Sequence, residues 1–158
     1  MEENDEEFMA AAFEQASQAE KHGEVPIGAV VVFKNQIVGS GFNKPIATND
    51  PTAHAEILAL RDAARTLKNY RLPDTTLYTT LEPCLMCAGA IVHARVHRLV
   101  FAATDLKNGA AGSVHNLLVP GLHTNHLKSC EGGLQAQLSS DLIRNFFSSR
   151  RRKIDKLN

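Results

Sequence analysis

The pattern of apolar and polar positions divides the chain into alternating helices and strands. Apolar residues recur at helical spacing from Phe8 to Ala16, which predicts an N-terminal helix that ends near residues 22–23. Residues 27–33 and 37–42 are rich in β-forming side chains, and the short polar segment 34–36 separates them. These two runs therefore predict a β-hairpin.

The middle of the chain continues this alternation with helices that begin directly after a turn or a strand. Residues 49–52 predict a turn and a helix cap, and the apolar spacing that follows predicts a second helix with His54 in its first turn. Residues 75–80 predict a strand, and Glu82-Pro83 predicts the start of a third helix because proline suits the first helical position. We expect the N-termini of these two helices to meet at one end of the sheet.

The last third of the chain is less regular. Residues 98–101 predict a short strand, and a loop rich in Gly and Ala follows at 104–113. No element is predicted from there to about His126. A final helix is expected from about Leu134 toward the basic C-terminus. The side chains predicted to form its buried stripe are Leu138, Leu142, Ile143, Phe146 and Phe147.

Strands that alternate with helices indicate an α/β domain in which helices pack on a central sheet. At 158 residues, the chain is expected to form a single domain, 1–158, with a basic helix end at about 148–158. Its 44% hydrophobic and 22% charged residues are typical of a folded protein. No window approaches the roughly 18 apolar residues of a membrane span, and the N-terminus lacks a secretory signal. We therefore expect a cytoplasmic protein that does not associate with membranes.

Positive and negative side chains are balanced in number but not in position. The 17 Lys and Arg residues equal the 17 Asp and Glu residues, so the molecule as a whole does not attract a polyanion. Acidic residues collect near the start, at Glu2, Glu3, Asp5, Glu6 and Glu7. Basic residues collect near the end, at Arg150, Arg151, Arg152, Lys153 and Lys156. By composition alone, such runs indicate solvated terminal helices.

The candidate chemistry lies in two short segments, His54-Ala55-Glu56 and Pro83-Cys84-Leu85-Met86-Cys87. Zinc binds imidazole nitrogen and thiolate sulfur in tetrahedral geometry, and a catalytic zinc keeps its fourth position for water. Cysteines at i and i+3 project from one face of a helix and can reach one ion. His54, Cys84 and Cys87 are therefore the predicted ligands. Glu56, two residues after His54, is the predicted proton shuttle.

A structural zinc site with four protein ligands would need a further Cys or His. His93 and His97 are the nearest candidates, but His93 lies six positions beyond Cys87 and nearly opposite it around the helix. The remaining histidines, expected at the surface or in loops, are His22, His115, His123 and His126. The odd cysteine count favours a metal over a disulfide framework and leaves Cys130 as a small buried hydrophobic residue.

His-x-Glu followed by Pro-Cys-x-x-Cys is the signature of zinc-dependent nucleobase deaminases. Segments 50–57 (DPTAHAEI), 69–72 (NYRL) and 80–90 (TLEPCLMCAGA) resemble the core of the bacterial tRNA-specific adenosine deaminases, within the cytidine and deoxycytidylate deaminase superfamily. The loop 105–113 (DLKNGAAGS) is similar to a segment typical of the tRNA enzymes, with Asn108 in place of a small hydroxyl residue. The resemblance covers most of the chain.

This resemblance implies a three-layer cytidine-deaminase-like fold, with a central mixed sheet and helices on both faces, and one zinc ion per subunit. It also implies a homodimer that hydrolyses adenosine to inosine at the wobble position of a tRNA anticodon stem-loop. The substrate contacts that follow from it are Asn43, Asp105, Arg150, Arg151, Arg152 and Lys153.

Two other functions remain open on the same residues. A deaminase of a free base or nucleoside, guanine above all, shares the metal site but does not need the basic C-terminus. A non-catalytic, zinc-stabilised nucleic-acid-binding module would need four protein ligands, and the sequence offers no good fourth.

Overall fold

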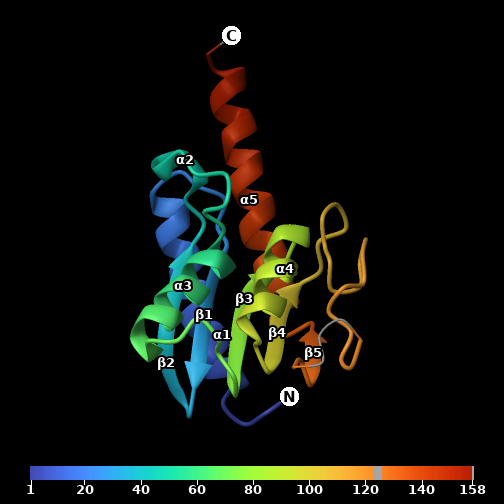
Figure 1. The fold of residues 1–158 in the computed structure, drawn as a ribbon. Helices are drawn as coiled ribbons and strands as arrows, with labels where there is room; N and C mark the ends of the chain where they lie inside the picture. Colours follow the sequence, from blue (N-terminus) through green and yellow to red (C-terminus); the bar gives the residue numbers. More distant parts are fainter. Residues whose placement is uncertain (123–125, 158) are drawn as a thin grey trace.

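A central sheet with helices along it forms the body of the molecule in the computed structural model, which describes residues 1–122 and 126–157 (Figure 1). In chain order the elements are α1 (Asp5–Lys21), β1 (Gly28–Phe33), β2 (Gln36–Phe42), α2 (Pro45–Thr48), α3 (Ala55–Leu67), β3 (Thr75–Leu81), α4 (Leu85–Ala94), β4 (Arg98–Ala103), β5 (Ser129–Gly132) and α5 (Ala136–Asp155). None of the helices in this part of the chain combines the length and the apolar character required to cross a lipid bilayer.

The sheet is mixed, with its five strands in the order β2-β1-β3-β4-β5. β1 pairs antiparallel with β2 and β3, whereas β3, β4 and β5 run parallel to one another. The predicted hairpin is formed by β1 and β2. Its turn consists of Lys34 and Asn35, with φ values of 50° and 57°, and is one residue shorter than predicted. Two consecutive left-handed residues allow such a short turn to follow the twist of the strands.

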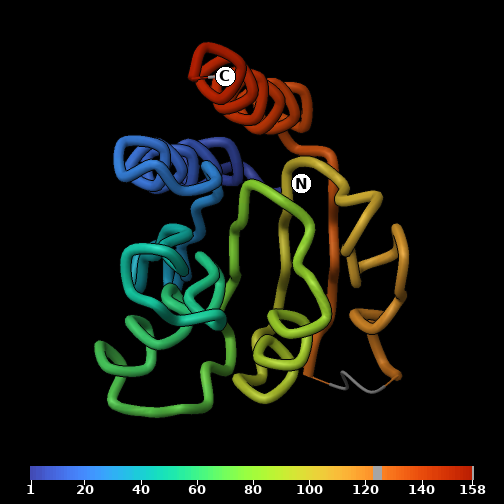
Figure 2. Tube along the Cα trace, turned by 90° about the horizontal axis from the view of Figure 1, so that it is seen from above, coloured from blue at the N-terminus to red at the C-terminus, as the bar shows by residue number. Residues whose placement is uncertain are grey.

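The helices form one layer on each side of the sheet (Figure 2). α1 and α5 lie on one side, and α3 and α4 lie on the other. Because successive strand residues point to opposite faces, Val31 of β1 packs in the core beneath α3 and α4, while Val30 and Val32 pack beneath α1. This arrangement confirms the predicted fold class, a mixed sheet between two helical layers.

Two glycines of β2 allow α3 to rest directly on the backbone of the strand. A Cβ atom at Gly39 would lie 2.4 Å from the carbonyl oxygen of Ala59, and one at Gly41 would lie 2.5 Å from that of Ala55. A Cβ atom cannot approach backbone atoms so closely. The first turn of α3, which follows His54, is therefore seated against the sheet.

A buried ionic network contradicts, at one of five positions, the expectation that the acidic run at the start of the chain is solvated, because Asp5 is buried while Glu2, Glu3, Glu6 and Glu7 are exposed. The Asp5 side chain is 1% exposed and accepts hydrogen bonds from the guanidinium of Arg98 and the hydroxyl of Tyr78, each at 2.7 Å. Arg98 also donates to Glu131 of β5 at 3.0 Å. The network ties α1 to the sheet where β4 begins, whereas Cys84 follows the end of the parallel strand β3. The two groups thus lie at opposite ends of these strands.

Three predicted helix starts differ from the structure. The second helix begins at Ala55, so His54 is its N-cap residue with an extended backbone rather than part of its first turn. The third helix begins at Leu85 rather than at Glu82-Pro83, because the Glu82 N–H still donates to the carbonyl of Ala103 at 2.8 Å and so continues the sheet. The last helix begins at Ala136, two residues later than predicted. The elements α2 and β5 were not predicted.

The predicted buried stripe of the last helix is wrong at two of its five positions. Leu138 is 52% exposed and Phe147 is 42% exposed, whereas Phe146 is buried and Leu142 and Ile143 are half-buried. Leu138 is exposed because the adjacent Ser139 faces the sheet, where its buried hydroxyl donates to the carbonyl of Thr80. Phe147 is exposed because α5 contacts β3 and β4 and then continues beyond the sheet (Figure 1). A helix that leaves the sheet has no partner for a continuous apolar stripe.

Candidate active site

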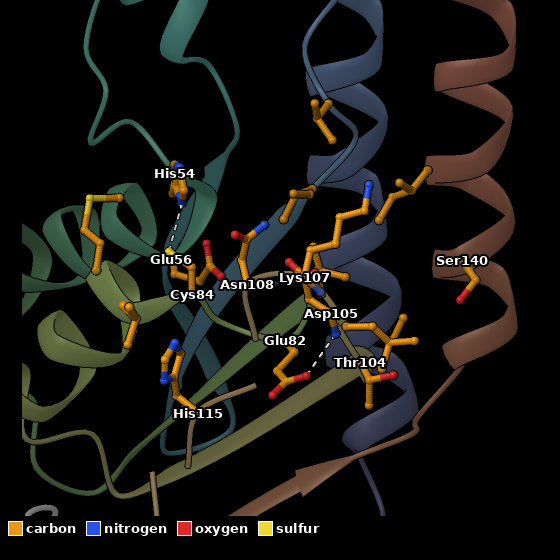
Figure 3. A pocket seen from close by; sticks show the side chains of 18 of the residues that line it. His54, Glu56, Glu82, Cys84, Thr104, Asp105, Lys107, Asn108, His115 and Ser140 are labelled. Carbon is orange, nitrogen blue, oxygen red and sulfur yellow. Dashed lines mark hydrogen bonds between the residues drawn. The ribbon is translucent and has the colours of Figure 1, made fainter. Parts of the chain in front are cut away.

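The N-terminal ends of α3 and α4 place one histidine and two cysteines side by side. His54 immediately precedes α3, Cys84 immediately precedes α4, and Cys87 lies in the first turn of α4. The Nδ1 atom of His54 lies 3.6 Å from the Sγ of Cys84 and 3.5 Å from the Sγ of Cys87. Figure 3 shows the His54 and Cys84 side chains pointing toward one another from the two helix ends. The three predicted ligands are thus brought together.

These distances fit a single tetrahedral zinc ion. Zinc with nitrogen at about 2.05 Å and sulfur at about 2.3 Å requires about 3.6 Å between the two ligand atoms at a tetrahedral angle. The ligand atoms of all three residues lie within 4.8 Å of one another. Imidazole and thiolate are donors that zinc prefers, and three protein donors leave the fourth position for water or substrate. The donor set is therefore that of a catalytic zinc site.

No fourth protein ligand joins this group among residues 1–122 and 126–157. His93 is exposed, and His97 lies near Arg98 at the other end of the strands. The remaining histidines with a described position, all exposed as expected, are His22, His115 and His126. His123 lies outside the described residues.

Glu56 lies in the first turn of α3 with 4% of its surface exposed. Burial raises the pKa of its carboxyl group to about 7. A group with a pKa near the working pH can both accept and release a proton efficiently. Because Glu56 lines the same cavity as His54 and Cys84, its position and its pKa suit it to proton transfer there.

Hydrogen bonding within the site favours the thiolate form of Cys84. The thiol of Cys87 and the imidazole of His54 donate to it, and together they lower the pKa of Cys84 to about 3. The pKa of Cys87 is raised, because its proton is held in the hydrogen bond to Cys84 and because the side chain is buried. The thiolate is the form of cysteine that binds metals, so Cys84 is already prepared for coordination.

A cavity of about 880 Å³ extends from the candidate ligands to α5 (Figure 3). His54, Glu56 and Cys84 line it at one end, residues 103–108 form a wall, and Phe147 lines it from α5. The cavity lies at the carboxyl ends of the parallel strands β3 and β4. This is the usual place for a ligand in an α/β sheet.

Of the predicted substrate contacts, Asp105 lines this cavity. Its Oδ1 atom accepts the backbone N–H groups of Lys107 and Asn108 at 2.9 Å and 3.1 Å, so it also shapes its own loop. Asn43 does not line the cavity. It is 7% exposed, and its Oδ1 atom has no hydrogen-bond partner within the described part of the chain.

The predicted basic contacts lie on the exposed last turns of α5, outside the cavity. They are Arg150, Arg151, Arg152 and Lys153. The guanidinium of Arg150 lies over the ring of Phe146, 4.7 Å from its centroid, and donates to the carbonyl of Gly23. These four residues, called the basic strip below, therefore begin within one turn of Phe147, which lies at the rim of the cavity.

The structure adds lining residues that the sequence analysis did not select. They include Val25, Ile27, Glu82, Lys107, Asn108, His115 and Ser140. Glu82 is the most notable of these, because its carboxylate is 2% exposed although it stands next to a cavity. Its signal in the sequence is an acidic residue between a buried strand and a metal-ligand motif, but by its position before Pro83 this residue predicts only a helix start.

Comparisons with known proteins agree with this geometry. Residues 2–103 match the cytidine and deoxycytidylate deaminase zinc-binding region. The tRNA-specific adenosine deaminase of Haemophilus influenzae is 48% identical over 155 residues, which cover 96% of this chain and 89% of that protein.

Solved structures of deaminases are also similar to this chain. One from a study of A-to-I editing by tRNA:A34 deaminases at the wobble position of transfer RNA aligns with a TM-score of 0.81 and 40% identity, over 86% of this chain and 98% of that chain. The guanine deaminase of Bacillus subtilis aligns with a TM-score of 0.61 and 42% identity, over 66% of each chain. The chain therefore belongs to the zinc-dependent cytidine and deoxycytidylate deaminase family.

Proposed function

We propose that this chain hydrolyses adenosine to inosine at the wobble position of a tRNA anticodon. The observation that carries the proposal is the buried Glu56 beside three candidate metal-ligand side chains, in a cavity that extends as far as Phe147 on α5, within one turn of the basic strip. The choice of substrate is supported by the Haemophilus influenzae relative, which is named a tRNA-specific adenosine deaminase. Its similarity extends beyond residues 2–103 to nearly the whole chain.

His54, Cys84 and Cys87 are the residues that would hold zinc. When bound in a site of this kind, zinc lowers the pKa of water to about 7 and so supplies hydroxide near neutral pH. The protein itself then has to move protons and to hold the base, and these tasks belong to Glu56 and to the cavity wall.

Glu56 performs the proton transfers in this mechanism. It takes a proton from the attacking water and delivers it to N1 of adenine while hydroxide adds at C6. Glu56 then takes the proton of the C6 hydroxyl group and passes it to the exocyclic amino group, the C6–N bond breaks as the C6 carbonyl forms, and ammonia leaves. Adenosine and water are converted to inosine and ammonia, and the carboxyl group returns to its first state.

The substrate has to be single-stranded, because the target atom cannot be reached inside a duplex. Asn43 and Asp105 are proposed contacts of the target nucleotide. The basic strip, Arg150, Arg151, Arg152 and Lys153, is proposed to contact phosphates of the stem. Phe147 lies between the cavity and the strip and is exposed, as a side chain that stacks on a neighbouring base has to be.

The assembly and the compartment are also part of the proposal. We infer a homodimer from the family resemblance and a cytoplasmic location from the tRNA substrate. Sedimentation of the purified protein tests the first, with an expected mass of twice the 17.2 kDa of one chain. A species with the mass of one chain at micromolar concentration would contradict it.

Incubation of the zinc-loaded protein with an anticodon stem-loop tests the proposed reaction. The stem-loop carries adenosine at the wobble position, and inosine is detected by sequencing. We expect inosine at that position and none at adenosines of the paired stem, with a rate at least about 10²-fold lower for the matched Glu56→Gln variant. Release of ammonia from free guanine, with no inosine in the stem-loop, would instead identify a free-base deaminase.

A further inference from the structure

Glu82 is a buried carboxylate that the proposed proton transfers do not use. It stands between the end of β3 and Cys84. Its oxygens accept hydrogen bonds from the backbone N–H groups of Asp105 at 2.9 Å, Ala111 at 2.9 Å and Ser113 at 3.0 Å, and from the hydroxyl of Ser113. All four donors belong to the loop 105–113. Figure 3 shows the bond from Asp105 to Glu82 at the base of the cavity.

The loop lies so close to Glu82 that no side chain fits at Gly109. A Cβ atom there would lie 2.4 Å from both the Cδ and the Oε2 of Glu82. Gly109 also forms a β-bridge with Cys84, and the N–H of Ala110 donates to the carbonyl of Pro83 at 2.8 Å. The loop is therefore attached both to the carboxylate and to the segment that carries a metal ligand.

The part of the loop that lines the cavity, residues 105–108, contains no strand or helix. Backbone N–H groups in such a segment have no regular ladder of partners, and buried ones have to be satisfied by other acceptors. The carboxylate of Glu82 supplies these acceptors at both ends of the loop, at Asp105 and at Ser113. Hydrogen bonds to an ionised acceptor are stronger than those between neutral groups.

We propose that Glu82 is a positioning residue for the deamination, whose carboxylate holds the 105–113 loop in place against the segment of the metal ligands. The inference rests on the proposed function in that the cavity beside this loop binds the substrate. Without the carboxylate, the 105–113 loop is no longer held against Glu82, so the cavity wall that it forms is less ordered and the substrate is bound less well. His54, Glu56 and the two cysteines keep their positions.

The Glu82→Gln variant tests this role, because it keeps the shape of the side chain but places an amide NH2 against N–H donors. We expect one zinc ion per chain, as in the wild type. The KM for the anticodon stem-loop should rise by about tenfold or more, the effect expected for lost hydrogen bonds to a buried charged group, while kcat changes by less than about threefold. Amide hydrogen exchange should accelerate at Asp105, Ala111 and Ser113 and remain slow in β3.

Asp5→Asn is the matched control, since Asp5 is a buried carboxylate at the other end of the strands. It should lower stability and leave KM and loop exchange unchanged. Ser113→Ala removes one of the four donors and should raise KM less than Glu82→Gln does. In the double variant the two effects should not add, because both act on one contact.

Unchanged KM and unchanged loop exchange in Glu82→Gln would overturn the proposal. Loss of zinc in that variant would also overturn it, because Glu82 would then support the metal ligands rather than the wall. If Glu82→Gln does not fold, the KM for the stem-loop and the amide exchange of the loop in Ser113→Ala test the proposal instead. A wild-type protein that produces no inosine would refute the proposed function, whereas zinc content and amide exchange require no substrate and still test Glu82.

Discussion

Two buried polar clusters lie at opposite ends of the parallel strands β3 and β4, and they differ in how their charges are balanced. At one end, Asp5 is paired with Arg98 and hydrogen-bonded to Tyr78. At the other end, Glu56 lies with His54 and the two cysteines, and it forms no ion pair with a Lys or Arg of the described residues.

The pKa values of the two carboxyl groups express this difference. Although burial raises the pKa of Asp5, hydrogen bonds from Arg98 and Tyr78 outweigh it and hold that pKa well below its usual range. For Glu56, burial dominates and raises the pKa to about 7. A carboxylate paired with a buried arginine stays ionised and takes part in the fold, whereas one with no Lys or Arg beside it can exchange protons near neutral pH.

The largest effect is expected when one candidate metal ligand is removed from the cluster around Glu56, which has no Lys or Arg to balance its charge. Cys84→Ala and His54→Ala should each lose zinc and, with it, all measurable deamination, because two remaining donors hold the ion poorly. A zinc assay on the purified variants measures this. Cys130→Ala is the matched control and should keep one zinc ion per chain. Full zinc occupancy in Cys84→Ala would show that the ligand is elsewhere.

Removing only the proposed proton shuttle should leave the metal bound and lower the rate of deamination. Glu56→Gln is expected to bind zinc normally and to lower kcat by about 10²- to 10⁴-fold or more, the contribution of a general acid/base. Zinc content and single-turnover kinetics on the same preparation separate the two effects. Near-normal turnover with zinc retained would refute the role of Glu56.

Breaking the Asp5–Arg98 cluster, in which the charges balance, should lower the free energy of unfolding and leave kcat unchanged. Arg98→Met leaves the buried Asp5 without its cation and should lower the free energy of unfolding by about 3–5 kcal/mol. Urea denaturation measures the change, with the exposed Lys128→Met as a control that should have little effect. If kcat of the folded variant fell as well, the two ends of the strands would not be independent.

At low pH the Asp5–Arg98 cluster should lose its contribution to the free energy of unfolding. Because the folded pKa of Asp5 lies below its unfolded value of about 3.9, the ionised group contributes stability above that value and loses it as the pH falls toward the folded pKa. The difference in unfolding free energy between wild type and Asp5→Asn should thus be constant from about pH 5 upward and shrink below about pH 4. Since both proteins share the metal site, this difference is independent of zinc loss. A constant difference down to pH 2 would contradict the assignment.

The smallest effect is expected at the basic strip. Arg152→Ala should weaken binding of the stem-loop severalfold and reduce the dependence of affinity on salt, because one phosphate contact is lost. Titrations at two salt concentrations measure both. Lys34→Ala, in the exposed β1–β2 turn, is the control and should change neither.

The meeting of the three candidate metal ligands was predictable although His54 and Cys84 are 30 residues apart, because the geometry within each of the two segments is local. Two cysteines three residues apart at a helix start share a direction, and each segment follows a turn or strand, so the meeting point is determined by the fold class. The burial of Asp5 was not predictable, since its partner Arg98 is 93 residues away and nothing distinguishes it from its solvated acidic neighbours. β5 has the sequence Ser-Cys-Glu-Gly, which lacks β-branched residues, and forms through its pairing with β4. Phe147 has the spacing of a core residue, but α5 has already left the sheet at that point.

The glycine at position 41 has a consequence for turnover. The atom it lacks would press on the peptide that joins Ala55 to Glu56, between the residue proposed to hold the metal and the one proposed to carry protons. One added methyl group on β2 would lift that peptide and misalign the two. A buried position with no reactive group, outside the lining of the cavity, thus leaves the room in which these two residues are aligned.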